Sequence, residues 1–157
     1  VRQHFNRHDP FARHLGIELL EVGPEHGVAV MPLDARHRNG MGHAHGGAIF
    51  ALVDMTFATV SNAAGYYCVN AQSNISYLEP GRIGPLRGEA RKIRSGRNLG
   101  TYEVRITDAD GTLVATSSQS RQENMTVKYY DYPGWFSSVC RCDKEYCLLS
   151  VGRGAGL

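Results

Sequence analysis

The chain has 157 residues, the length of one ordinary domain with a single core. Its composition is 42% hydrophobic and 20% charged with a formal net charge of +2, too mildly basic to indicate nucleic-acid binding. The basic residues form no long run and no apolar stretch reaches the roughly 18 residues that cross a bilayer, so we expect no nucleic-acid partner and no membrane association. The N-terminus lacks a signal-peptide core and the four cysteines are unevenly placed, which favours a cytoplasmic location.

The first elements expected in chain order are a short helix and a hairpin. Asp9 suits an N-cap, Pro10 the first helical position and Gly16 the end of the helix. Residues 17–21 and 27–33 are rich in strand-forming types, and the intervening GPEHG predicts a turn between two paired strands.

A loop and one long helix follow the hairpin. Residues 35–45 are rich in His, Arg, Asn and Gly and predict a loop, whereas residues 46–64 are apolar on nearly every helical face. Such a helix must be wrapped by the rest of the fold. Asp54 is its single carboxylate, and burying an ionised carboxylate without partners costs several kcal/mol. A functional reason for Asp54 is therefore expected, although a structural carboxylate satisfied by Asn or Thr neighbours is the alternative.

The second half of the chain predicts four consecutive strands, separated by turn sequences, at residues 67–78, 86–93, 99–107 and 112–120. Strands joined by short turns after a single long helix indicate an α+β fold, in which one antiparallel sheet curls around that helix.

The end of the chain has a different character. Residues 123–157 contain the only Trp, three of the four Cys and a Gly-rich end, without clear periodicity. We therefore predict a folded domain at residues 1–122 and an atypical C-terminal tail at 123–157, disordered or loosely docked. Cys140, Cys142 and Cys147 match no standard zinc spacing, and no metal site is predicted there.

One segment carries a recognisable pattern. In NGMGHAHGGAIFALVD, Asn39 is followed six residues later by His45, Gly46 and Gly47, and Asp54 comes nine residues after the His. This segment resembles the active-site segment of hotdog-fold acyl-CoA thioesterases of the phenylacetyl-CoA thioesterase (PaaI-like) type, and the resemblance extends from about residue 9 to residue 122. It implies a hotdog fold, homodimers that pair into homotetramers, an acyl-CoA substrate, and no cofactor, since coenzyme A is part of the substrate.

The residue types themselves suit thioester chemistry. A helix N-terminus presents unpaired N–H groups and a partial positive charge, so the amide of Gly46 is a candidate oxyanion-hole donor. The absence of side chains at Gly46 and Gly47 keeps the approach open to a thioester oxygen. Asp54 would attack the thioester carbon or draw a proton from an attacking water. Eight helical residues separate Gly46 and Asp54 by about 12 Å, so a shared site needs Asp54 from a second protomer and predicts a dimer.

Further candidates surround this pair with less defined roles. His45 would orient the loop or hydrogen-bond near the thioester, and Asn39 would position a water or Asp54. The resemblance implies that Asn74, Ser76 and Tyr77 line the acyl pocket. It also implies that one turn lies near the pantetheine and phosphates of coenzyme A, where guanidinium groups pair well with phosphate; the turn consists of Arg94, Ser95, Gly96 and Arg97. A merely solvated turn is an equally good interpretation. His37, His43 and His45 lie close in sequence, but loop histidines are more often solvated than metal-bound, and no metal is predicted.

The resulting hypothesis is a thioesterase that hydrolyses a small or medium acyl-CoA, with aryl acyl groups included, to the free acid and coenzyme A. A hydratase or dehydratase on acyl thioesters is one alternative, although such relatives arrange a catalytic His and carboxylate differently. A non-catalytic acyl-CoA binder is another, against which Asp54 argues because binding needs no base.

Overall fold

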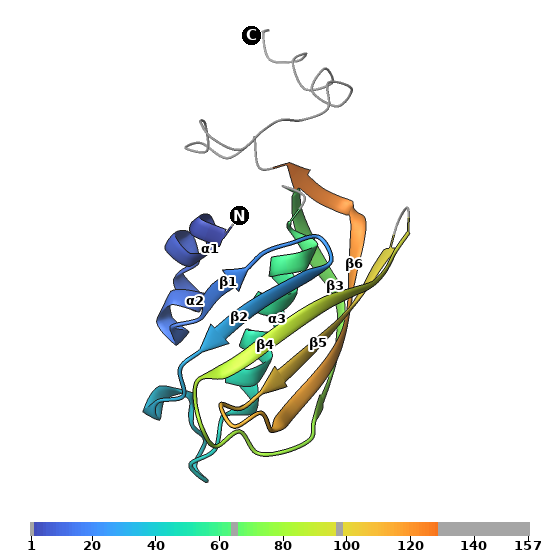
Figure 1. Ribbon diagram of the computed structural model, residues 1–157. Coiled ribbons are helices and arrows are strands. Elements are labelled where there is room, and N and C mark those ends of the chain that lie inside the picture. The colour runs from blue at the N-terminus through green and yellow to red at the C-terminus, as the bar shows by residue number, and fades with distance from the viewer. Residues whose placement is uncertain (1, 64–65, 97–98, 129–157) are drawn as a thin grey trace, which may run out of the picture.

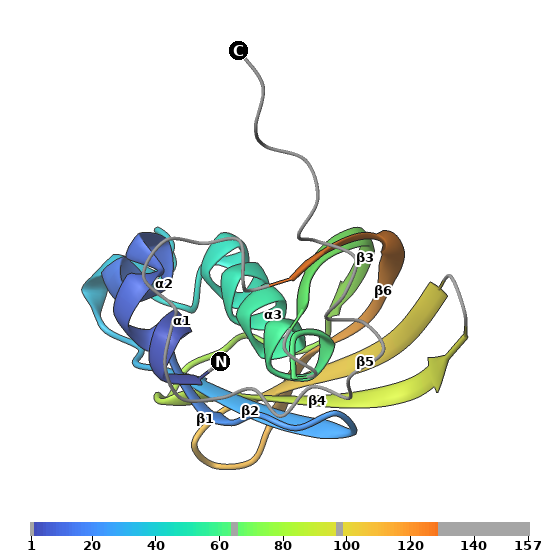
Figure 2. The ribbon, with the colours of Figure 1, turned by 90° about the horizontal axis from the view of Figure 1, so that it is seen from above.

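The computed structural model describes residues 2–63, 66–96 and 99–128 (Figure 1). Its elements, in chain order, are α1 (Arg2–His8), α2 (Pro10–Leu15), β1 (Glu18–Glu21), β2 (His26–Met31), the 3-10 turn η1 (Ala35–His37), α3 (Gly46–Ser61), β3 (Tyr66–Tyr77), β4 (Leu86–Ser95), β5 (Leu99–Thr107) and β6 (Leu113–Lys128). The six strands form one antiparallel sheet in the order β1-β2-β4-β5-β6-β3. The sheet curves around α3, which confirms the predicted α+β hotdog architecture (Figure 2).

The two N-terminal helices lie beside β1. The predicted N-cap and C-cap of α2 are confirmed. The Asp9 side chain accepts a hydrogen bond from the amide of Ala12 at 2.8 Å, and Gly16 adopts the left-handed conformation with φ 65°. Helix α1 was not predicted, and it buries none of its residues, so it leaves no apolar periodicity to detect. The amide side chain of Asn6, which bonds both backbone groups of Leu19, ties α1 to β1.

The core lies between α3 and the concave face of the sheet. Two glycines allow the closest approach, because a Cβ on Gly27 or Gly88 would overlap the side chain of Thr59 or Thr56. The largest fully buried apolar side chains are Tyr102, Leu19, Met31, Leu52, Leu86 and Ile106. Within the described residues, no helix is both long and apolar enough to span a membrane.

One face of α3 is left uncovered in the single chain. Gly47, Phe50 and Asp54 follow each other at helical spacing and are exposed, with Phe50 at 38%. The expectation of a fully wrapped helix with a buried Asp54 is therefore wrong for the isolated chain, because the sheet covers α3 from one side only. Composition alone does not show which apolar face meets the sheet and which faces away from it.

Strand β3 forms one margin of the sheet, and β6 is its only neighbour among the described strands. β6 continues past residue 122 to Lys128, and its last residues pair with the beginning of β3, where Tyr66 lies opposite Lys128. The sheet thus takes in the first residues of the predicted tail. The remainder of that segment, including its three cysteines, lies outside the described residues.

Candidate active site

A buried histidine anchors the loop that leads into α3. The ring of His37 is fully buried, accepts the amide of Asp34 at Nδ1 (3.1 Å) and bonds the carbonyl of Leu15 at Nε2 (2.7 Å). Its own carbonyl accepts the amide of His45 at 2.7 Å. A side-chain hydrogen bond from Arg36 holds the pKa of the exposed Asp34 below its usual range. These contacts tie the end of α2 and both ends of the 38–45 loop together.

Asn39 shapes the middle of this loop. Its Oδ1 accepts the amides of Met41 at 2.9 Å and His43 at 3.2 Å, in the manner of an Asx turn. Its backbone N–H donates to the carbonyl of His43 at 2.8 Å. Within the single chain Asn39 therefore fixes the loop ahead of the helix, and its predicted role in positioning a water or the Asp54 of a second chain stays a prediction.

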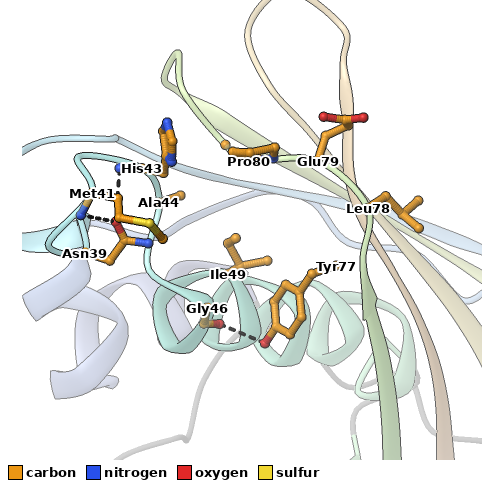
Figure 3. Close-up of a pocket in the computed structure, with 11 residues that line it drawn as sticks. Asn39, Met41, His43, Ala44, Gly46, Ile49, Tyr77, Leu78, Glu79 and Pro80 are labelled. Atoms are coloured by element: carbon orange, nitrogen blue, oxygen red, sulfur yellow. Dashed lines mark hydrogen bonds between the residues drawn. The ribbon is translucent and has the colours of Figure 1, made fainter.

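The first turn of α3 leaves one amide free. The ring Nδ1 of His45 accepts the N–H of Gly47 at 3.0 Å, and the carbonyl of His45 accepts the amides of Ala48 and Ile49. The amide of Gly46 has no hydrogen-bond acceptor among the described residues. The hydroxyl of Tyr77 donates to the carbonyl of Gly46 at 3.0 Å and so holds this residue in place (Figure 3). Of the two glycines, Gly46 is thus the one with an available donor.

An open cavity of about 330 Å³ lies beside the free amide, a size within the range of small-ligand sites. Apolar side chains dominate its wall, with Met41 and Leu78 exposed at 78% and 50% (Figure 3). The lining residues are Asn39, Met41, His43, Ala44, Gly46, Ile49, Tyr77, Leu78, Glu79, Pro80 and Gly81. Three predicted site residues, Asn39, Gly46 and Tyr77, therefore share this cavity.

Asp54 lies apart from the cavity, two helical turns further along the exposed face of α3. Its Oδ1 accepts a hydrogen bond from Nδ2 of Asn70 on β3 at 3.2 Å. Asn70 is not among the predicted site residues, because irregularities in the β3–β6 register on both sides of it break the alternation that would assign its face. No pattern in the sequence signals this contact between residues 16 positions apart.

The remaining predicted residues lie elsewhere in the single chain. Asn74 and Ser76 line a second open concavity of about 370 Å³ together with residues of β4, β5 and β6, so they do not join Tyr77 beside Gly46. Arg94, Ser95 and Gly96 are exposed at the end of β4, while Arg97 lies outside the described residues. Backbone groups occupy both ring nitrogens of His37 and one of His45, and in the described part of the chain no three metal-ligating side chains cluster.

Comparison with known proteins identifies the family of this chain. Residues 41–115 match the family described as the thioesterase superfamily. The acyl-coenzyme A thioesterase PaaI of Escherichia coli is 31% identical over 108 residues, which span 68% of this chain and 77% of that protein.

Solved structures show the same likeness. The PaaI protein from the phenylacetic acid degradation operon of Escherichia coli matches with a TM-score of 0.72 and 28% identity over 76% of this chain and 88% of that one. A protein from Streptococcus pneumoniae described as a hypothetical thioesterase, solved with coenzyme A, matches with a TM-score of 0.64 and 26% identity over 71% of this chain and 86% of that one. The chain therefore belongs to the thioesterase superfamily, as a PaaI-like thioester hydrolase with the hotdog fold.

Proposed function

We propose that the protein hydrolyses acyl-CoA thioesters to the free acid and coenzyme A. The observation that carries this proposal is the free amide of Gly46 at the start of α3, beside an apolar cavity. A helix N-terminus carries about half a positive charge, and an unpaired amide there stabilises the negative charge that develops on a thioester oxygen. His45 and Tyr77 fix the backbone on both sides of this donor without occupying it.

Asp54 supplies the second half of the reaction. In one route its carboxylate takes a proton from a water while the water oxygen bonds to the thioester carbon; in the other, the carboxylate attacks that carbon itself. In both routes the negative charge moves to the carbonyl oxygen at Gly46. Collapse then breaks the carbon–sulfur bond, and the thiolate of coenzyme A leaves and takes up a proton, from the protonated Asp54 in the first route and from water in the second. In the second route the acyl group remains on Asp54 as a mixed anhydride, and a water then hydrolyses it to the free acid and restores the carboxylate. The hydrogen bond from Asn70 orients the carboxylate for either route.

A second copy of the chain completes the site. Gly46 and Asp54 on one helix are separated by about 12 Å along its axis, too far to act on one carbonyl. The exposed face of α3 with Phe50 and Asp54 adjoins the free margin of β3, as the Asn70 contact shows. Pairing of two β3 margins around a two-fold axis would continue the sheet, cover both α3 faces and set each Asp54 beside the partner's helix. We propose this homodimer as the active unit, with a dimer of dimers as its further assembly.

The cavity indicates the class of acyl group. Its apolar wall, with Met41, Ile49 and Leu78, suits a small or medium acyl chain or an aryl acyl group. The relative solved with coenzyme A supports the coenzyme as the common part of the substrate. We place the phosphates of coenzyme A near the exposed turn that begins at Arg94, where guanidinium groups pair with phosphate. The proposed reaction requires no cofactor and no metal.

The variant Gly46→Pro tests the proposal directly. Proline is favoured at the first helical position and lacks the N–H group, while His45 already has the extended backbone, φ −68° and ψ 135°, that precedes a proline. We expect acyl-CoA hydrolysis, followed by the release of free thiol, to fall by about 100-fold, as when an oxyanion-hole donor is removed.

The matched control is Gly46→Ala, which keeps the N–H group. A Cβ at this position meets Tyr77 at an ordinary contact distance of 3.5 Å, so activity should remain close to that of the unaltered protein. Equal activities of the two variants would contradict the assigned oxyanion hole. A protein that binds a panel of acyl-CoAs but releases no thiol from any of them would contradict the proposed activity itself.

A further inference from the structure

Gln119 on β6 lies behind the proposed base, and we infer that it is a positioning residue, which acts on Asp54 through Asn70. This inference rests on the proposed function, in which Asp54 is the catalytic carboxylate. Gln119 is 1% exposed, and its side chain forms hydrogen bonds with Asn70, Ser73 and Ser117. Its side chain forms the centre of a polar chain that crosses from β6 to β3 and ends at the carboxylate.

The chain of hydrogen bonds is continuous from the backbone of β3 to Asp54. The hydroxyl of Ser117 donates to the carbonyl of Asn74 at 2.7 Å, and Gln119 Nε2 donates to Ser117 Oγ at 2.9 Å. Asn70 Nδ2 lies 2.5 Å from Gln119 Oε1, 2.6 Å from Ser73 Oγ and 3.2 Å from Asp54 Oδ1, so its two N–H groups face three acceptors.

Ser73 joins the same group from β3. Its Oγ lies 2.6 Å from Asn70 Nδ2, and its hydroxyl donates to Gln119 Oε1. Gln119 Oε1 thus accepts from two residues of β3, which fixes the side-chain amide between the two strands.

The direction of every bond in this chain follows from its first member. A backbone carbonyl can only accept, so the proton of the Ser117 hydroxyl points to Asn74 and leaves Ser117 Oγ as an acceptor. Gln119 must then present its NH₂ group to Ser117 and its carbonyl oxygen to Asn70. That oxygen in turn requires the NH₂ group of Asn70, which thereby also faces Ser73 Oγ and the carboxylate of Asp54.

The reverse orientation of Asn70 is unfavourable while Gln119 is in place. A turned amide would set Asn70 Oδ1 against the carbonyl oxygen of Gln119 and the carboxylate of Asp54, acceptor against acceptor. Asn70 Oδ1 is buried and has no partner among the described residues, so it offers no hydrogen bond that would hold the amide in place. Gln119 is therefore the group that makes Asn70 a donor to Asp54.

The variant Gln119→Met tests this inference, because methionine is similar in size and fills the buried space without the amide. We expect kcat for acyl-CoA hydrolysis to fall by about tenfold, the effect of one misplaced hydrogen bond to a charged group, with KM nearly unchanged. The double variant Asn70→Ala/Gln119→Met should have the same kcat as Asn70→Ala alone, because Gln119 acts through Asn70. Full additivity of the two losses, or an unchanged kcat in Gln119→Met, would overturn the inference.

A milder variant and a control keep the test interpretable if Gln119→Met folds poorly. Ser117→Ala removes the acceptor that orients Gln119, and it should lower kcat by a smaller factor in a chain with native circular dichroism. Ser118→Ala alters the exposed neighbour on the same strand and should change neither kcat nor KM. An unchanged kcat in a folded Ser117→Ala variant would also count against the proposed role of Gln119.

The outcome separates this inference from the proposed function. If Asp54→Asn retains full turnover, the proposed role of Asp54 is wrong, and Gln119 and Asn70 have no catalytic carboxylate to position. If Asp54→Asn is inactive while folded Gln119→Met and Ser117→Ala keep the kcat of the unaltered protein, the proposed function stands and the inference about Gln119 is wrong.

Discussion

At the residue scale, the proposed reaction uses one backbone amide and one side-chain carboxylate, which lie apart on the same helix. The proposed donor, the amide of Gly46, belongs to the backbone, and the His45 cap and the Tyr77 hydroxyl hold that backbone in place. The proposed base, Asp54, is a side chain held by an amide from a neighbouring strand. A side chain can be deleted without disturbing the helix that carries it, which makes Asp54 the simplest point at which to test the chemistry.

Asp54→Asn should abolish turnover while the fold persists. Asparagine has nearly the same shape but neither attacks the thioester nor takes a proton from water at neutral pH, so we expect kcat to fall by about 100-fold or more. Because asparagine keeps an oxygen that accepts the hydrogen bond from Asn70, the free energy of unfolding measured in urea should stay within about 0.5 kcal/mol of that of the unaltered protein. A variant that unfolds instead would show that the carboxylate is structural.

At the element scale, α3 lies unusually close to β2 and β4. The side chains of Thr59 and Thr56 occupy the space that a Cβ would need at Gly27 and Gly88, and both threonine hydroxyls donate to carbonyls of the helix itself. This contact sets how deeply the helix sits in the sheet. The position of the helix relative to the Tyr77 end of β3, and with it the cavity, depends on that depth.

Gly88→Ala should therefore destabilise the protein by about 1–3 kcal/mol, the usual cost of forcing an extra methyl group into a packed core. The measurement is urea unfolding, followed by circular dichroism. Part of the loss should be regained when Thr56→Ala is added, because the two side chains compete for one space.

Gly40→Ala serves as the control for this experiment. Nothing lies within 4 Å of a Cβ at Gly40, so the change should be nearly neutral. A loss in Gly88→Ala that is the same with and without Thr56→Ala would contradict the proposed overlap.

The elements also show what a sequence can predict. The α2 caps, the strands and the start of α3 follow from local signals, such as Asp9 before Pro10, and all appear in the structure. The exposure of Asp54 and its contact with Asn70 depend on which helix face meets the sheet and on bulges in β3, and neither has a local signal. Gln119 is a buried amide on a strand, and only its neighbours in space give it a role.

At the scale of the whole molecule, the proposed site belongs to a pair of chains. Each chain contributes Gly46 to one site and Asp54 to the other, so two differently damaged copies should complement each other. This arrangement distinguishes a shared site from any site completed within one chain.

A mixed dimer tests the shared site. We expect Asp54→Asn and Gly46→Pro homodimers to be nearly inactive, whereas a mixed dimer purified through two different tags should regain about half the activity of the unaltered dimer. One of its two sites combines the intact Gly46 with the intact Asp54, and the other has lost both groups. Thiol release from acyl-CoA measures the recovery, and verified mixed dimers without any recovery would rule out sharing.

The extension of β6 to Lys128 bears on how far the chain can be shortened. Truncation at residue 122 would remove the strand residues opposite the first part of β3, whose other side already has no neighbour among the described strands. Backbone amides and carbonyls at that end of β3 would then lose the partners that β6 supplies, and fraying would start at the corner of the sheet nearest the end of α3. A minimal catalytic fragment should accordingly keep every residue up to position 128.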